Sequence, residues 1–267
     1  MSKKILHLGL GKVASSSIQK YVQERFAVAN PSSLVVGPFH NTEILYSLQR
    51  FLHYNEVDRR LMDFINNQEN WFISYEGLIS WDPAYWQFTL NRLDYLLDLS
   101  NCEVIILHRN SKRYFDSVYK QAVAVGVTLS EEGFFKLKLE KTLPEIYSNI
   151  SFSKKDYNIG ELLNSIKKKS KRVDAFLLEQ DGLGAMQVRL GLAVSEIPKV
   201  NISYSRVGLI LKRAQNRALK LVGFPTYQEM VDFRFKRVSE IKDKRKYRLL
   251  FYRIGQKFRL LDRVLKF

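Results

Sequence analysis

Short apolar runs recur along the chain, and each is followed by residues with the spacing of an amphipathic helix. The runs occupy residues 5–8, 34–36, 71–75, 104–107 and 175–178, and each has the length and residue types of a buried strand. Helical spacing is found at 18–26, 41–52, 56–66, 83–98, from 111 onward, at 183–191 and at 205–220, and residues 130–170 are predicted to be mostly helical. The alternation of strands and helices predicts an α/β fold in which helices flank a short parallel sheet.

Composition supports a folded chain with one large core. The 267 residues are 46% hydrophobic, which is enough for a domain of this size. We expect an α/β domain over residues 1–220, followed by a basic helical extension at 221–267. The single cysteine, Cys102, excludes an internal disulfide and a cysteine-based zinc site, and its apolar surroundings in the sequence predict a buried, unreactive thiol.

Targeting and membrane signals are weak. The first apolar run is too short for the hydrophobic region of a signal peptide. No uninterrupted apolar stretch approaches the roughly 18 residues that cross a bilayer. We therefore expect a soluble protein of the cytoplasm.

The net charge of +16 favours anionic partners, and most of the excess lies near the end of the chain. Residues 233–267 hold thirteen lysines and arginines against three acids, interleaved with aromatic and aliphatic residues. Part of this segment has the pattern of a basic amphipathic helix. Three uses are open: docking on the anionic inner face of a membrane, gripping an acidic acceptor, or packing on the domain with a solvated basic face.

The segment from Gly9 to Gln19 has the features of an anion-binding loop. It follows the first predicted strand and leads into the first predicted helix, and it contains Lys12 and three consecutive serines, Ser15, Ser16 and Ser17. Small residues let backbone N–H groups turn toward an anion, and the helix N-terminus adds partial positive charge. The spacing differs from the loop of nucleoside triphosphatases, which requires Gly-Lys-Ser/Thr after four spacer residues. The alternative is a serine-capped helix after an ordinary turn.

This segment resembles the 5′-phosphosulfate loop of sulfotransferases that use 3′-phosphoadenosine 5′-phosphosulfate (PAPS), whose usual form is Pro-Lys-Thr/Ser-Gly-Thr-Thr. Lys12 matches the family's lysine, and Ser15 and Ser16 match its paired threonines. Gly11 and Ala14 stand where the family has proline and glycine. The resemblance implies that the donor's 5′ side is bound by Gly11, Lys12, Val13, Ala14, Ser15, Ser16 and Ser17.

A second signature lies about a hundred residues further on. Arg109 ends a predicted strand, and Ser117 follows eight positions later in the next predicted helix. The family's 3′-phosphate motif is an arginine at a strand end with a serine at this spacing, and a guanidinium and a hydroxyl so placed can grip one phosphate. Taken singly, Arg109 is better explained by a surface ion pair and Ser117 by a solvated helix hydroxyl, but the two signatures together, in order and on the expected elements, favour the phosphate motif.

Sulfuryl transfer resembles phosphoryl transfer, so catalysis is expected to come from positioning and electrostatics, with Lys12 neutralising the charge that develops. The acceptor hydroxyl also needs a general base. Glu76, at the end of the predicted strand 71–75, is the first candidate, and His40, in the loop after the second strand, is the second. No metal is expected in this scheme.

The sequence therefore predicts a PAPS-dependent sulfotransferase that acts on a hydroxyl of a saccharide or another hydroxylated acceptor. Two other functions stay open. A nucleotide-dependent kinase would bind ATP with magnesium. A non-catalytic protein that binds anions or membranes would depend on residues 233–267, and nucleic acid is the less favoured partner for it.

Overall fold

The structure is a computed structural model that describes residues 3–10, 15–54, 58–80, 82–124, 126–136, 139–140, 149–150, 153–194 and 205–221. The chain divides into two compact units, Met1–Tyr114 with Phe152–Asn201 and Phe115–Ser151 with Ile202–Phe267. Nearly all of the expected extension at 221–267 lies outside the described residues. Its boundary at residue 220 and its helical structure therefore remain predictions.

The first unit is built on a five-stranded sheet in which every pairing is parallel. The strand order is β2-β3-β1-β4-β7, so the first strand of the chain lies at the centre. The strands are β1 (Lys4–Gly9), β2 (Leu34–Val36), β3 (Trp71–Ser74), β4 (Glu103–His108) and β7 (Arg172–Leu177). The predicted α/β fold with a short parallel sheet is confirmed.

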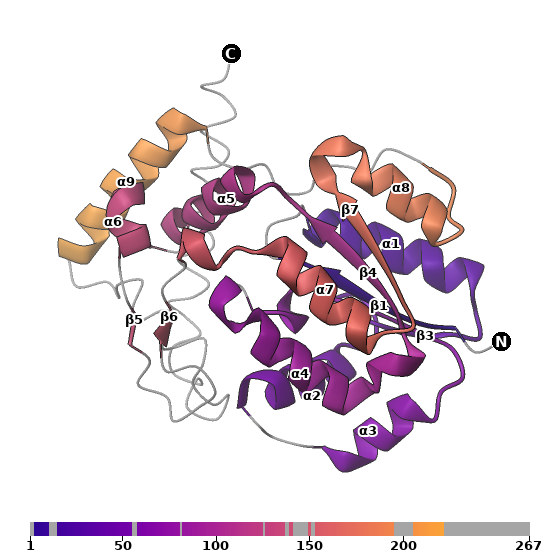
Figure 1. Cartoon of the computed structure of the whole chain (residues 1–267). Helices are drawn as coiled ribbons and strands as arrows, with labels where there is room; N and C mark the ends of the chain where they lie inside the picture. The colour runs from indigo at the N-terminus through magenta and orange to yellow at the C-terminus, as the bar shows by residue number, and fades with distance from the viewer. Residues whose placement is uncertain are drawn as a thin grey trace. The chain divides into compact units, whose positions relative to one another are not determined.

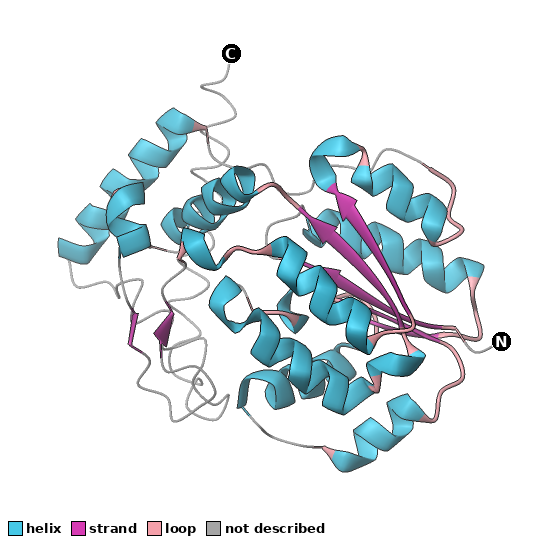
Figure 2. Cartoon of the chain, in the orientation of Figure 1, coloured by secondary structure: helices cyan, strands magenta, loops and turns pink. Residues whose placement is uncertain are grey.

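Helices cover both faces of this sheet, with α1 and α8 on one face and α2, α4 and α7 on the other (Figure 1, Figure 2). The α-helices of the unit are α1 (Ser15–Ala29), α2 (Thr42–Tyr54), α3 (Arg59–Asn66), α4 (Trp86–Leu97), α7 (Ile159–Lys169) and α8 (Gly182–Arg189). Short 3₁₀ turns are η1 (Glu76–Leu78), η2 (Pro83–Tyr85), η3 (Leu99–Asn101), η4 (Lys154–Asp156) and η5 (Leu178–Gln180). A connection between two parallel strands of one sheet returns along the face of the sheet, so each such helix packs on it.

The core lies against the central strands, where apolar side chains point to both faces. On the α1 and α8 face, Val22, Phe26 and Met186 pack on Ile5 and the neighbouring strands. Leu6 and Leu8, on the opposite face of β1, are fully buried. Burial on both faces explains why the strand sequences are continuous apolar runs rather than alternating ones.

Cys102, immediately before β4, is fully buried. Its thiol lies 3.5 Å from the carbonyl oxygen of Leu97 and 3.4 Å from that of Asp98. Burial raises the pKa of the Cys102 thiol to about 12, so the reactive thiolate is scarce at neutral pH. The prediction of a buried, unreactive thiol is confirmed.

The second unit contains most of α5 (Ser111–Ala124), which begins at the end of the first unit. Its other elements are α6 (Glu131–Lys136), β5 (Leu139–Glu140), β6 (Asn149–Ile150) and α9 (Arg206–Leu221). The Asn216 side chain ties α9 to the end of α5 by donating to the carbonyl oxygens of Val123 and Val127, at 2.8 and 3.0 Å. Among the described helices of the chain, none is long and apolar enough to cross a membrane.

The prediction that 130–170 is mostly helical is wrong in its middle. α6 and α7 are helices, but β5 and β6 form an antiparallel pair between them, in which Leu139 is opposite Ile150. Pro144, which has no N–H to donate and clashes with the preceding turn of a helix, is the residue in the sequence that argues against a helix through this region.

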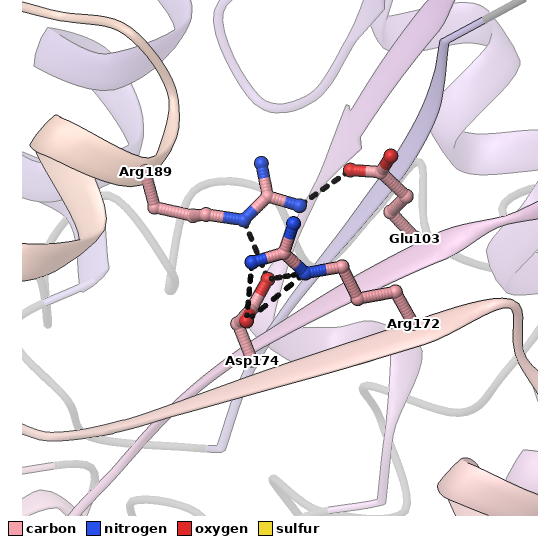
Figure 3. A network of polar contacts seen from close by, with 4 residues as sticks. All are labelled: Glu103, Arg172, Asp174 and Arg189. Carbon is pink, nitrogen blue, oxygen red and sulfur yellow. Dashed lines mark hydrogen bonds and ion pairs between the residues drawn. The ribbon is translucent and has the colours of Figure 1, made fainter.

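An ion-pair network joins the amino ends of β4 and β7 to the end of α8 (Figure 3). Arg189, the last residue of α8, contacts Glu103 of β4 and Asp174 of β7, both at 2.5 Å. Arg172 also pairs with Asp174, at 3.0 Å. The Arg189 side chain is 17% exposed, whereas that of Arg172 is 55% exposed.

Replacing Arg189 with methionine should lower the free energy of unfolding by about 2–3 kcal/mol, because Glu103 would lose its partner while largely shielded from water. Urea denaturation measures this loss. The matched variant Arg172→Met removes a more exposed partner of the same Asp174 and should cost less than about 1 kcal/mol. Equal losses in the two variants would contradict the assignment of Arg189 as the residue that joins the three elements.

Candidate functional site

The carboxyl ends of the five parallel strands meet at one edge of the sheet. β1 ends at Gly9 and β4 at His108, and the two strands are neighbours with Gly9 opposite Leu107. The N–H of Leu10 continues this pairing by donating to the carbonyl oxygen of Leu107, at 3.3 Å. The segment that leaves β1 and the arginine that follows β4 therefore start from adjacent strand ends, although they are about a hundred residues apart in the sequence.

The predicted anion-binding loop is only partly within the described structure. Gly11, Lys12, Val13 and Ala14 lie outside the described residues. Ser15, Ser16 and Ser17 form the first turn of α1, as their sequence predicts. The first N–H groups of a helix have no intrahelical acceptor, so this turn offers donors and partial positive charge near the end of β1. The donor-binding roles of these seven residues remain predictions.

Arg109 lies directly after β4, and an acidic residue that the sequence reasoning missed lies beside it. Glu179, in η5 after the neighbouring strand β7, approaches Nε of Arg109 at 3.4 Å. The same carboxylate accepts the backbone N–H of Asn110 at 3.1 Å. Burial lowers the pKa of the Arg109 guanidinium, and the charge of Glu179 acts in the opposite direction. The signal that could have revealed Glu179 is its place at the end of the predicted strand 175–178.

A phenol fixes the backbone at the end of β4. The hydroxyl of Tyr157 donates to the carbonyl oxygen of Arg109, and its ring packs against Trp86 and Tyr114, with centroids 5.2 and 4.9 Å away. Burial raises the pKa of Tyr157, so its hydroxyl stays protonated and able to donate. The position of Arg109 is therefore set by the aromatic cluster beneath it as well as by the sheet.

Ser117 lies in α5, in the part of that helix that belongs to the second unit. Its side chain is half-buried. The spacing from Arg109 corresponds to about two helical turns. Its role in gripping a phosphate together with Arg109 stays a prediction.

Glu76, the first candidate for the general base, begins η1 just beyond the end of β3 and is half-buried. The strand end is held by the N–H of Tyr75, which donates to the carbonyl oxygen of His7 at 3.3 Å. Tyr114 is a fully buried phenol near Glu76. The pKa of Tyr114 is raised well above its usual value, first by burial and then by the charges of Tyr157, Asp82 and Glu76. Glu76 therefore lies at the carboxyl edge, beside a low-dielectric interior.

His40, the second candidate, closes a tight turn after β2. Gly37 and His40 exchange backbone hydrogen bonds of 2.8 and 3.3 Å, and the turn is fastened to α1 by Gln23, whose Oε1 accepts the N–H of Phe39 at 3.4 Å. Gly37 has no room for a side chain, since an added Cβ would lie 2.1 Å from Nε2 of Gln23. The His40 ring is half-buried, and its Nε2 has no hydrogen-bond partner in the described part of the chain.

His7 lies in a buried polar group beneath α1. Its Nδ1 is 2.8 Å from Oγ of Ser74, and the carbonyl oxygen of Ser74 accepts Nε2 of Gln23 at 3.0 Å. The His7 side chain is 2% exposed. Burial lowers the pKa of His7 to about 4, so the ring is neutral at physiological pH.

Within the described residues, no three His, Cys, Asp or Glu side chains are grouped so as to hold a metal ion.

Comparison with known proteins gives one structural similarity. No family model matches the chain, and no curated protein matches its sequence. Among solved structures, a sulfotransferase from Alicyclobacillus acidocaldarius is similar over 91% of this chain and 99% of its own, with 14% sequence identity and a TM-score of 0.42.

The neutral, buried state of His7 makes a prediction about stability and pH. The pKa of about 4 in the folded protein lies below the unfolded value of 6.5, so the unfolded chain binds the extra proton between these values. Stability should be fully present above pH 6.5 and fall as the pH drops toward 4, by about 3 kcal/mol from this residue.

Urea denaturation at a series of pH values measures the effect. The comparison variant is His7→Asn, whose amide can replace Nδ1 opposite Ser74 but does not titrate. It should be less stable at pH 7 and lose less stability between pH 7 and 4 than the original protein. Identical slopes would show that folding does not lower the pKa of His7.

Proposed function

We propose that the chain is a sulfotransferase that moves the sulfuryl group of PAPS to a hydroxyl of a saccharide or a similar hydroxylated acceptor. Two short motifs of the sequence resemble the donor-binding motifs of that family, one at Gly9–Gln19 and one at Arg109 with Ser117. In the proposal the first motif binds the 5′ side of the donor and the second binds its 3′-phosphate. The acceptor class rests on the resemblance alone.

The observation that carries the proposal is the pairing of β1 with β4. The register that sets Gly9 opposite Leu107 brings the starts of the two motifs to neighbouring strand ends. Ligands of open parallel sheets bind outside the carboxyl ends of the strands. A donor with phosphates at both ends of its ribose needs two cationic or N–H-rich sites a short distance apart, and adjacent strand ends meet that requirement.

The reaction requires little covalent chemistry from the protein. The acceptor oxygen forms a bond to sulfur as the bond between sulfur and the bridging oxygen of the 5′-phosphate breaks, and 3′-phosphoadenosine 5′-phosphate leaves. In the proposal, Lys12 and the N–H groups at the start of α1 stabilise the charge that grows on the leaving phosphate. Arg109 and Ser117 hold the other end of the nucleotide. No step of the scheme needs a metal.

The acceptor hydroxyl gives its proton to a base, for which we propose Glu76. The carboxylate begins η1 at the carboxyl edge, is half-buried, and lies near the buried Tyr114, so it is placed where an acceptor hydroxyl would reach the edge of the sheet. His40 is the alternative, because its buried Nε2 has no partner within the described structure.

Calorimetric titration with 3′-phosphoadenosine 5′-phosphate tests donor binding. We expect micromolar affinity for the original protein, and a loss of about 10-fold or more in Lys12→Ala and in Arg109→Ala, because each removes a charged contact to a phosphate. ATP with magnesium, the ligand that a kinase would require, should bind far more weakly.

Glu179→Gln is the informative companion variant. The substitution removes the negative charge that pairs with Arg109 and would compete with a bound phosphate. It keeps an oxygen that can accept the N–H of Asn110. We therefore expect equal or tighter binding of the bisphosphate. Absence of binding by the original protein would rule out the sulfotransferase. Loss of binding in Glu179→Gln alone would mean that Glu179 holds Arg109 in place and does not compete with the ligand.

The variants Glu76→Gln and His40→Gln distinguish between the two candidate bases. If Glu76 takes the proton, Glu76→Gln should lower kcat by about 100-fold or more with donor affinity unchanged, whereas His40→Gln should retain most activity. Transfer of ³⁵S from labelled PAPS to a panel of saccharides measures both. The reverse pattern would assign the base to His40.

A further inference from the structure

Gln19 has a buried donor group that is not accounted for by the fold. This residue lies in the second turn of α1 and is 3% exposed. Its Nε2 is shielded from water and has no hydrogen-bond partner among the described residues. A buried donor without an acceptor is costly, and such groups in folded proteins are nearly always satisfied by protein, water or ligand.

The position of Gln19 follows from that of Gln23, one turn further along the same buried face of α1. Nε2 of Gln23 donates to the carbonyl oxygen of Ser74, which is the last residue of β3. α1 connects the parallel strands β1 and β2 and so runs opposite to them. Gln19 is therefore displaced from Gln23 toward the carboxyl edge, beyond the end of β3.

The general geometry of helices bears on where the Gln19 side chain reaches. Side chains of an α-helix lean toward its N-terminus and cover the preceding turn. That turn is formed by Ser15 and the residues after it, which follow the segment leaving β1. A lean of this kind brings the carboxamide toward the turn of α1 whose first N–H groups have no acceptor within the helix.

The other polar groups under α1 are engaged with one another. Oγ of Ser74 is bonded to Nδ1 of His7, and the carbonyl oxygen of Ser74 accepts Nε2 of Gln23. Oε1 of Gln23 accepts the N–H of Phe39. Nε2 of His7, on the same face of the sheet, is a second buried nitrogen without a partner among the described residues. These hydrogen bonds include none to Nε2 of Gln19.

We propose that Gln19 binds the ligand, by donating its amide hydrogens to oxygens of the tetrahedral anion that sits at the N-terminus of α1. The group is the 5′-phosphate of the donor and the sulfuryl oxygens attached to it, so this assignment rests on the proposed function. A neutral carboxamide adds directional donors at a place where the helix already supplies partial positive charge. The anion would thus accept from a buried donor that has no partner within the described part of the chain.

The test compares Gln19→Met, which keeps the length of the side chain but removes the donors, with the original protein. In calorimetry, 3′-phosphoadenosine 5′-phosphate should bind about 10-fold or more weakly to the variant. Adenosine 3′-phosphate, which lacks the 5′-phosphate, should bind both proteins equally. A second variant, Gln19→Glu, has the same shape but presents a carboxylate. Its negative charge repels the phosphate, so its affinity for the bisphosphate should be lower still.

Thermal unfolding without ligand gives a readout that a structural role would not produce. Gln19→Met removes an unpaired buried amide, so its Tm should be equal to or about 2–4 °C above that of the original protein. The matched variant Gln23→Met breaks two hydrogen bonds and should lower Tm. Gln187→Met changes a buried glutamine of α8 and should leave affinity for the bisphosphate unchanged.

The outcomes separate the two proposals. The assignment of Gln19 is overturned if Gln19→Met binds the bisphosphate as tightly as the original protein does. It is also overturned if the variant loses affinity for both nucleotides alike. In either case the proposed function stands. If the original protein binds neither nucleotide, the proposed function fails. In that case, thermal unfolding with inorganic sulfate tests the assignment of Gln19. Sulfate should raise the Tm of the original protein and not that of Gln19→Met. An equal rise in the two proteins would overturn the assignment.

Discussion

The parallel pairing of β1 with β3 on one side and β4 on the other is the constraint on which the rest of the first unit depends. Its register brings Gly9 next to Leu107 and His7 next to Ser74, so the segments that follow three different strands begin at one edge. A shift of register would displace the candidate residues together and expose the apolar faces of β1. Apolar packing of the strands therefore determines where the candidate residues lie, independently of their polar contacts.

Much of this arrangement could be predicted from the sequence because burial leaves a simple pattern. Strands covered by helices on both faces are uninterrupted apolar runs, and the position of Arg109 at a strand end follows from the run 104–107. Contacts between distant segments leave no such pattern. Nothing near Arg109 in the sequence indicates that Glu179 will lie beside it, and nothing near Gln23 indicates that it will hold the turn at Gly37. The pair β5 and β6 was missed for the same reason, since short strands are stabilised by partners rather than by their own periodicity.

The polar layer under α1 shows how the fold carries buried hydrogen-bonding groups close to a candidate site. Hydrogen bonds link His7 to Ser74 and Ser74 to Gln23, and they tie α1 to the end of β3. An apolar layer of the same volume would be at least as stable, since buried polar groups gain little net free energy. The benefit is direction, because hydrogen bonds specify where the helix begins and apolar contacts do not.

The ion pair between Arg109 and Glu179 bears on how an anion would be bound. A guanidinium at 25% exposure would be costly to hold without a counter-charge, and Glu179 supplies one. An incoming phosphate then exchanges one anion for another, so the net gain is smaller than the attraction of an unpaired arginine would suggest. The ion pair also discriminates between ligands, because a neutral ligand cannot take the place of the Glu179 carboxylate as the counter-charge of Arg109. The same reasoning applies to the role proposed for Gln19, because its Nε2 has no partner among the described residues and a bound anion would accept from it. Under the two proposals, the charge of Arg109 at one strand end and the buried amide of α1 near another both favour a ligand that carries phosphate or sulfate groups at two positions.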